Sequence, residues 1–572
     1  MHRLDHHEAG WMVDGPVGTS MNVRQADRRL ALFMGVALVF LLAIFGRVFY
    51  VQVLAAPGLK AKAESQSVAT PTLSAHRGSI LDRSGEVLAC PQPMATVSAT
   101  PYLVKDPAKT AAKLAPLLRV SEKELTTKFT GKGGFVYLAR KIDPSVGAKV
   151  KALKLTGVDV SSEDLRVYPD RALAPQLLGF VDTENKGVAG LEKQYDALLS
   201  GTPGSEQVVR DVLGQRLKTL SEKASTNGRN LTLTIDSDIQ YEADTVLTEL
   251  VRQFSAEKAS AVVLDPQTGE VLAMANTPVF DTNAFAQTKP ADQRNATVSD
   301  QYEPGSTFKV VVAAAALSAG LVTPETTFSL TPTLTLYDLV VHEAEAVPGV
   351  RHLSVTQIIA QSSNVGAVTL GRQVGKNRLT DMIYRFGFTQ PLGIDFPGET
   401  GGSMPSPEKW SGTTIGNVPI GQGVAVTPLQ MASAYAAIAN GGLLMQPHLV
   451  KDGKSHVLRQ VISPVVASEL RSMLTVTVQS GTGTRAQVQG YDVAGKTGTA
   501  QAFNPNGGGY AEGKYVASFV GMVPADTPRL VILVVVNEPS SQHLGGDVAA
   551  PAFAAIAKFS LEHLGIAPKG QK

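Results

Sequence analysis

The first strong pattern along the chain is an apolar run close to its N-terminus. No charged residue stands between Leu30 and Gly46, and the apolar character continues from Val48 to Ala56 after a single Arg47. With this continuation the segment is long enough to cross a bilayer as a helix, and its uncharged part exceeds the usual apolar core of a cleaved signal peptide. The pattern therefore predicts a transmembrane helix over residues 30–54.

The residues in front of this run predict its orientation. Arg24, Arg28 and Arg29 precede it, and positive charge collects on the cytoplasmic side of a membrane span. We expect a single-pass signal anchor in the cytoplasmic (inner) membrane, with residues 1–29 as a cytoplasmic tail and the bulk of the chain exported. A signal peptide cleaved near Ala55-Ala56 and a buried helix of a soluble protein are the alternatives.

A second pattern, towards the C-terminus, predicts antiparallel strands. Residues 260–264 and 271–275 are apolar runs around an Asp-Pro-Gln-Thr-Gly turn, the composition of a hairpin. Residues 515–523 and 530–536 flank a second, proline-containing turn, and a strand-like stretch runs from Tyr491 to Ala502. Five strands, mostly antiparallel, follow from these runs.

Helical patterns account for much of the same region. Helix signals gather between Gly305 and Gly442, inserted between the two groups of strands, and further helices are predicted from Asp238 to Phe254 and from Pro551 to Leu564. A helical subdomain packed against a mostly antiparallel sheet gives an α+β fold. We expect this domain to cover residues 229–572, with an active-site cleft between its two halves.

The section between the membrane segment and this domain has short strand and helix signals separated by many turns. Residues Arg77–Ala89 hold an Asp-Arg-Ser-Gly turn between two strand-like stretches, the pattern of a hairpin. This stretch contains no nucleophile set beside a base, so a structural role is favoured. Residues 55–228 are therefore predicted to form a separate, mixed α/β, non-catalytic domain.

Composition removes several function classes. The chain has 52 basic and 50 acidic residues, a net charge of +2, which gives no indication of nucleic acid binding. Its single cysteine, Cys90, is compatible with an exported protein without internal disulfides and is interpreted as a small, semi-buried apolar residue. The ten histidines lack the paired spacing of metal ligands, so neither a metal nor another cofactor is expected.

The first chemically suggestive motif runs from Ser306 to Lys309. A turn signal precedes it and an apolar run follows, so a helix is expected to begin at Ser306, with Lys309 on the same face. A serine hydroxyl is a poor nucleophile until a base takes its proton, and a lysine can be that base only if burial or a nearby cation lowers its pKa. The alternative is that Ser306 is only an N-cap.

The second motif, Ser362-Ser363-Asn364, lies between a capped amphipathic helix over residues 353–360 and a run of small residues, at a predicted junction of two helices. A hydroxyl and an amide that project from such a junction can relay a proton and hold a substrate carbonyl. Taken alone, the motif is better explained as an ordinary helix cap.

The third motif, Lys496-Thr497-Gly498-Thr499, lies on the strand-like stretch. Side chains alternate along a strand, so Lys496 and Gly498 share one side while Thr497 and Thr499 share the other. The glycine permits close approach of a ligand, and a lysine beside a hydroxyl suits a carboxylate-terminated substrate. Lys496 is also the cation expected to lower the pKa of Lys309.

The three motifs, in this order, resemble those of a known protein family. Ser-x-x-Lys, Ser-Asp-Asn and Lys-Thr-Gly mark class A β-lactamases and penicillin-binding proteins, and the chain resembles the transpeptidase domain of the class B penicillin-binding proteins. Ser363 stands where the class A pattern has Asp, which the class B family tolerates. Further strings support the resemblance, in the catalytic half and in the family's non-catalytic pedestal module: Glu303–Lys309, Ile420–Gly423, Val426–Gln430, Ala439–Gly442, Val493–Ala500, and Arg77–Ala89, Arg166–Pro169, Leu178–Val181, Gly187–Glu192.

The resemblance implies a serine β-lactamase-like fold and D,D-transpeptidation of peptidoglycan stem peptides, on lipid-linked or nascent glycan strands. It implies that Ser306 attacks the carbonyl between two terminal D-alanines, with Lys309 as its base. It also implies that Ser362 relays a proton and that Asn364 orients the acyl-enzyme. Lys496, Thr497 and Thr499, around Gly498, are implied to bind the terminal carboxylate. The backbone N–H groups of Ser306 and Thr499 are implied to form the oxyanion hole. β-Lactams are expected to acylate the same serine.

Within the family, the division-septum (FtsI) type is favoured over the elongation and sporulation types, because the pedestal is compact and no C-terminal repeats follow Leu564. The resemblance implies partners at the membrane: a SEDS-type glycan polymerase and other division proteins. Two further interpretations stay open, a β-lactamase-like hydrolase or β-lactam sensor, and a non-catalytic division scaffold.

Overall fold

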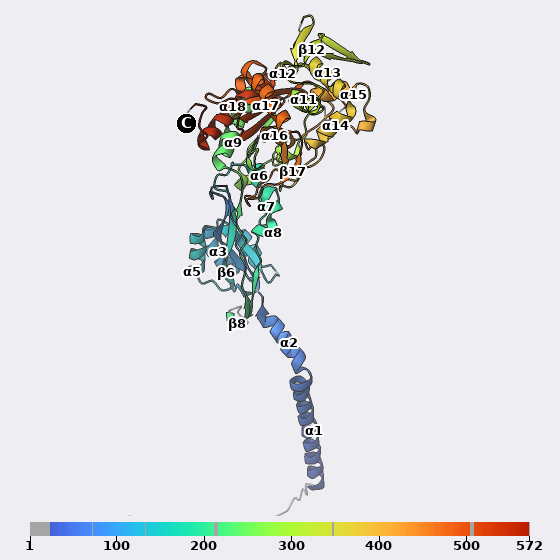
Figure 1. The fold of residues 1–572 in the computed structure, drawn as a ribbon. Helices are drawn as coiled ribbons and strands as arrows, with labels where there is room; N and C mark the ends of the chain where they lie inside the picture. The colour runs from blue at the N-terminus through green and yellow to red at the C-terminus, as the bar shows by residue number, and fades with distance from the viewer. Residues whose placement is uncertain are drawn as a thin grey trace, which may run out of the picture. The chain divides into compact units, whose positions relative to one another are not determined.

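The computed structural model describes residues 23–70, 72–131, 133–210, 216–345, 348–503 and 508–570, which fall into two compact bodies (Figure 1). The first comprises the chain up to Thr72 together with Ser205–Lys223, and the second comprises Leu73–Gly204 and Ala224–Lys572. Most of the predicted cytoplasmic tail, residues 1–22, lies outside the described residues.

The first body holds the N-terminal helices. Helix α1 (Val23–Phe49) continues into a π-helical turn, η1 (Tyr50–Leu54), and α2 (Ala56–Ser67) follows. The stretch Asp27–Leu54 is long and apolar enough to cross a membrane, as the apolar pattern predicted. A four-stranded sheet follows, in which β7 (Gly204–Arg210) pairs with β1 (Val68–Ala69), β2 (Thr72–Leu73) and β8 (Arg216–Lys223).

The N-terminal part of the second body is built around the long strand β4 (Val87–Ala99). The predicted hairpin is present, because β3 (Ile80–Leu81) pairs antiparallel with β4 and places Ile80 opposite Ala89. The other elements of this part are β5 (Val136–Ile142) and β6 (Val158–Val167), which also pair with β4, β9 (Leu231–Thr232), which pairs with β3, and the helices α3 (Pro107–Leu118), α4 (Glu122–Phe129) and α5 (Pro144–Ala152).

A buried ion network joins the sequence strings that resemble the pedestal module. Glu192 is fully buried and accepts hydrogen bonds from Arg77 Nε at 2.7 Å and from Arg166 Nε at 2.6 Å. Tyr168 donates a third, at 3.3 Å. Charges this deep are tolerated only when paired. The structural role predicted for the Arg77 segment is therefore supported by its contacts.

The C-terminal part of the second body contains the predicted five-stranded sheet. Its order is β11-β10-β20-β19-β18, and every neighbouring pair is antiparallel. The strands are β10 (Lys258–Leu264), β11 (Val271–Asn276), β18 (Ala494–Phe503), β19 (Tyr510–Val523) and β20 (Leu530–Asn537). Strand β18, which carries the third motif, forms one edge of the sheet.

Both faces of this sheet are covered, which explains why its central strands are continuously apolar. Along β20, Val531, Leu533 and Val535 face one core while Ile532 and Val534 face the other. Helices α9 (Ser237–Phe254) and α18 (Gly545–His563) contact each other on one face (Figure 1). The inserted helices α11 (Lys309–Ser318), α16 (Pro428–Ala439) and α17 (Pro464–Ser480) supply the core of the other.

Two details differ from the sequence-based expectation. The last helix was predicted to begin at Pro551, but α18 begins at Gly545 and Pro551 lies inside it. A proline is favoured in the first turn of a helix, and this preference misplaced the boundary. The predicted helical subdomain also contains two small sheets, formed by β12 (Thr327–Leu330) with β15 (Arg351–Ser354) and by β13 (Thr333–Leu336) with β14 (Leu339–His342).

Candidate functional site

Ser306 lies on a 3₁₀ helix, η4 (Gly305–Phe308), that leads directly into α11. The turn before it requires glycine, because Gly305 has φ = +54° and an added Cβ would stand 2.7 Å from the carbonyl oxygen of Thr499. Tyr435 on α16 fixes the other side of the turn by donating a hydrogen bond to Thr307 O at 2.9 Å. Ser306 is thus held beside the third motif, half-buried, and it does not cap the helix.

The second motif lies at the predicted junction, between α12 (Val355–Ala360) and α13 (Asn364–Val374). Ser363 is the N-cap of α13 and accepts a hydrogen bond from Gly366 N at 2.9 Å, so the cap interpretation is correct for this residue. Ser362 has a left-handed backbone, with φ = +59°. A non-glycine residue in that conformation is strained, which marks the junction as a functional candidate.

Lys309 links the first motif to the second. It is fully buried, and its Nζ donates to Ser362 O at 2.5 Å, to Asn364 Oδ1 at 2.7 Å and to Ser362 Oγ at 3.2 Å. The ammonium of Lys309 therefore sits one helical turn after Ser306 and inside the pocket of oxygens made by the second motif.

The third motif brings a second buried lysine to the same place. Lys496 is fully buried on the edge strand β18 and donates to Thr497 O at 3.2 Å and to Thr497 Oγ1 at 3.3 Å. Gly498 faces η4, because an added Cβ would stand 2.8 Å from Pro304 O and 3.0 Å from Thr307 Cγ2. Thr499 Oγ1 accepts from Gly545 N at 3.1 Å, at the start of α18. Gly498 and Thr499 therefore face different neighbours, whereas the Lys496 amine curls over to the hydroxyl of Thr497.

Burial sets the protonation of both lysines. Removal from water lowers the pKa of Lys309 to about 7, and the nearby carboxylate of Glu343 opposes that fall. The pKa of Lys496 is lowered well below its usual value by burial and, in addition, by the charge of Lys309. In the part of the chain that the structure describes, neither lysine forms an ion pair with a carboxylate. A lysine with a pKa of about 7 can act as a proton acceptor at physiological pH.

The structure thus brings together the residues predicted from the three motifs. Within the described residues the Ser306 hydroxyl makes no hydrogen bond, so the role of Lys309 as its base stays a prediction. The prediction of an open cleft at this point stays a prediction. Glu343, which follows β14 and contacts the second motif, was not among the residues predicted from the sequence. Its only signal was its place between an apolar strand and that motif, because no pattern of its own surrounds it.

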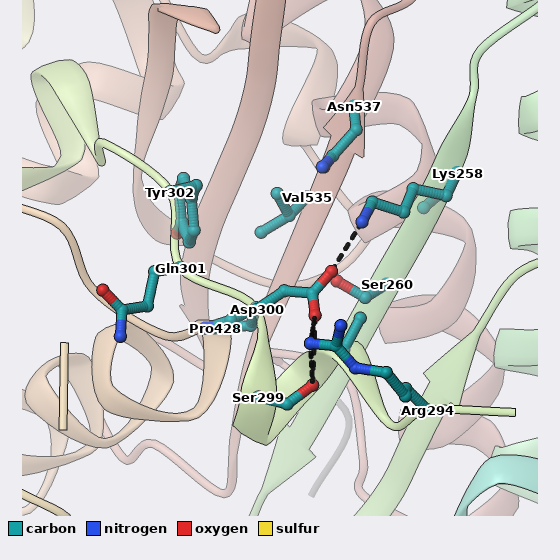
Figure 2. Close-up of a pocket in the computed structure, with 12 residues that line it drawn as sticks. Lys258, Ser260, Arg294, Ser299, Asp300, Gln301, Tyr302, Pro428, Val535 and Asn537 are labelled. Atoms are coloured by element: carbon teal, nitrogen blue, oxygen red, sulfur yellow. Dashed lines mark hydrogen bonds and ion pairs between the residues drawn. The ribbon is translucent and has the colours of Figure 1, made fainter. Parts of the chain in front are cut away.

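A separate cavity of about 370 Å³ lies at the paired ends of β10 and β20 (Figure 2). Its charged side chains are paired with one another. Asp300 accepts from Lys258 at 2.5 Å and from Arg294 at 2.8 Å, so the carboxylate is neutralised by two cations. None of the three motifs contributes to its described lining, and the cavity is distinct from the site around Ser306.

Comparison with known proteins agrees with this geometry. Residues 72–233 match the penicillin-binding protein dimerisation domain, and residues 259–558 match the penicillin-binding protein transpeptidase domain. The chain is 34% identical over 549 residues to the peptidoglycan D,D-transpeptidase FtsI of Escherichia coli, over 94% of this chain and 92% of that protein. It is 36% identical over 569 residues to the penicillin-binding protein PbpB of Mycobacterium tuberculosis, over 92% of this chain and 84% of that one.

Solved structures of related proteins share this fold. The crystal structure of penicillin-binding protein 3 from Mycobacterium tuberculosis, complexed with aztreonam, superimposes with a TM-score of 0.67 at 32% identity and covers 87% of this chain and 98% of that one. A peptidoglycan synthetase from Bifidobacterium adolescentis gives a TM-score of 0.72 at 28% identity, over 88% and 98% of the two chains. With both domains matched in order and close relatives aligned over nearly the whole chain, this protein belongs to the class B penicillin-binding proteins.

Proposed function

We propose that the protein is a peptidoglycan D,D-transpeptidase that works through an acyl-enzyme on Ser306. The Ser306 oxygen attacks the carbonyl between the two terminal D-alanines of a stem peptide, and the C–N bond to the last D-alanine breaks. The released amine takes up a proton and leaves as free D-alanine. An amine of a neighbouring strand then attacks the ester, forms the cross-link and returns Ser306 to its starting state.

Lys309 is the base in this proposal. The environment of Lys309 is the single observation on which the proposal rests. The residue is buried, has a pKa of about 7 and lies against Asn364 and against Ser362, which is the group that would pass a proton onward. General base catalysis of this kind contributes roughly 10²–10⁴-fold to rate. Ser362 relays the proton to the leaving amine, and Asn364 orients the acyl-enzyme.

The edge strand binds the substrate in this proposal. Lys496, Thr497 and Thr499 hold the terminal carboxylate, and Gly498 lets the peptide approach the strand. The backbone N–H groups of Ser306 and Thr499 form the oxyanion hole, with each donor contributing roughly 10²–10³-fold. The close approach of Gly305 to the Thr499 carbonyl supports this pairing, because it brings the two backbones together.

Labelling with a fluorescent penicillin tests the assignment. The wild-type protein should carry one covalent label per chain, and Ser306→Ala should carry none while keeping its melting temperature. Equal labelling of Ser306→Ala would overturn the role of this serine. Rapid loss of the label from the wild type would favour a β-lactam hydrolase instead.

The physiological setting that we propose is septal wall synthesis. The relative in Escherichia coli is named FtsI, and the N-terminal apolar helix fits a single-pass membrane protein. We propose that the N-terminus is cytoplasmic, that residues 55–228 form the pedestal and that residues 229–572 form the exported catalytic domain. A SEDS-type polymerase and other division proteins are the partners that we propose for the protein. Depletion of the protein should cause filamentation, whereas rounding of the cells would indicate a role in elongation.

A further inference from the structure

Glu343 has a place in the site that the three motifs do not account for. It follows β14, and its side chain is only 6% exposed. Both of its carboxylate oxygens are used: Oε1 accepts from Ser363 Oγ at 2.6 Å and from Arg351 at 2.9 Å, and Oε2 accepts from the backbone N of Asn364 at 2.7 Å. A carboxylate that accepts several hydrogen bonds is held in one orientation.

These contacts lead to Lys309 in two steps. Asn364, whose backbone is fixed by Glu343, accepts from Lys309 Nζ through its side-chain oxygen at 2.7 Å. The amide nitrogen of the same side chain donates to His342 O at 2.9 Å, so the residue before Glu343 also orients it. The backbone N–H and the side-chain amide nitrogen of Asn364 are therefore both held by one short segment, and the side-chain oxygen is left to face the lysine.

The charge of Glu343 is also significant because it acts on the buried Lys309. The titratable and charged groups around this point are Lys309 on α11, Arg351 on β15 and His342 beside Glu343 itself. Lys496 on β18 is the charge that acts on Lys309 from the other side of the site. Arg351 pairs with Glu343, and His342 is exposed. Glu343 is the carboxylate whose charge opposes the loss of a proton from Lys309.

We propose that Glu343 is a positioning residue for the acyl-transfer reaction: it fixes Asn364 against Lys309, and its negative charge stabilises the buried ammonium of that lysine. Glu343 touches neither Ser306 nor the place of the scissile bond, so it acts through Lys309 and Asn364. The inference rests on the proposed function, since it assumes that Lys309 is the base for Ser306.

The test is the pH profile of acylation by benzylpenicillin, measured on the full-length protein in detergent. Glu343→Gln preserves the shape but removes the charge, so Lys309 should lose its proton more readily. We expect the midpoint of the profile to move to lower pH by roughly 0.5–1 unit. We also expect the plateau rate to fall about tenfold, because a single amide oxygen cannot replace both carboxylate oxygens.

Two variants make the result specific. Glu343→Asp retains the charge and should keep the wild-type midpoint, even if its shorter side chain lowers the plateau rate. Glu345→Gln removes an equal charge from an exposed position two residues away and should change neither quantity. If Glu343→Gln has the wild-type midpoint and plateau, or if Glu343→Asp shifts the midpoint as far as Glu343→Gln, the inference is wrong while the role of Ser306 stands. Absence of acylation in the wild type would instead refute the proposed function.

Discussion

At the scale of single residues, the most consequential feature is the burial of Lys309. A buried ammonium without a carboxylate partner is costly, and the protein relieves that cost by lowering the pKa of the group. Three oxygens surround Lys309 Nζ and hold the amine in place beside the second motif. The same burial that makes the residue energetically expensive makes it a competent base.

The first prediction follows from this pKa. Because the neutral amine of Lys309 accepts the Ser306 proton, the second-order rate constant for acylation should rise as pH increases through about 7 and level off above it. Stopped-flow acylation between pH 5.5 and 9 measures the profile. A rate that is flat across this range, or that keeps rising towards pH 10, would show that Lys309 is not the titrating base.

Gly498 provides a second prediction at the residue scale. A methyl group at this position would stand 2.3 Å from Ser518 Oγ and 2.8 Å from Pro304 O, so η4 must move away from the edge strand. We expect Gly498→Ala to slow acylation at least tenfold and to cost about 1–3 kcal/mol of stability through overpacking. Gly508→Ala, in the connection between β18 and β19, is the matched control because it meets no atom within 4 Å.

At the scale of elements, the sequence predicts a strand or helix best where both faces of the element are covered. The hairpin of β10 and β11 and the hairpin of β19 and β20 follow from apolar runs separated by turn residues. The start of α18 does not, because Pro551 is accommodated within the helix while the tertiary contacts of Gly545 with β18 set its true beginning. Local preference and long-range packing disagree there, and packing decides.

The residues of the candidate site also differ in whether the sequence could predict them. The residue types and spacing of the three motifs predicted Ser306, Lys309, Ser362 and Lys496, because each motif is local in sequence. Glu343 could not be predicted, because its meaning comes from hydrogen bonds to Ser363 and Asn364, about twenty residues later, that only the folded chain creates. The small sheets that place it were hidden within a segment whose helical signals dominated.

The pedestal network yields a prediction at the element scale. Glu192→Gln would leave Arg77 and Arg166 buried beside an uncharged group, and breaking a buried ion pair in this way costs about 3–5 kcal/mol. The melting temperature of the full-length protein should therefore fall markedly. Glu124→Gln, which removes an exposed pair with Lys128 in the same part of the chain, should change it little. Similar melting temperatures for the two variants would contradict the structural role of the network.

At the scale of the whole molecule, the site forms because three distant segments of the chain converge. The three motifs are separated by long stretches of chain, and they meet because the inserted helices return the polypeptide to the edge strand of the sheet that surrounds them in sequence. Neither the sheet nor the helices contain the complete site. This division of the site explains why each motif alone is uninformative and why their combination identifies the family.

The most direct test of this convergence is peptide mapping by mass spectrometry after reaction with benzylpenicillin. The account predicts one covalent adduct, on the peptide that contains Ser306, and its disappearance in a Lys309→Gln variant assayed for the same time. An adduct on a different residue, or full modification of Ser306 at the wild-type rate without Lys309, would contradict it.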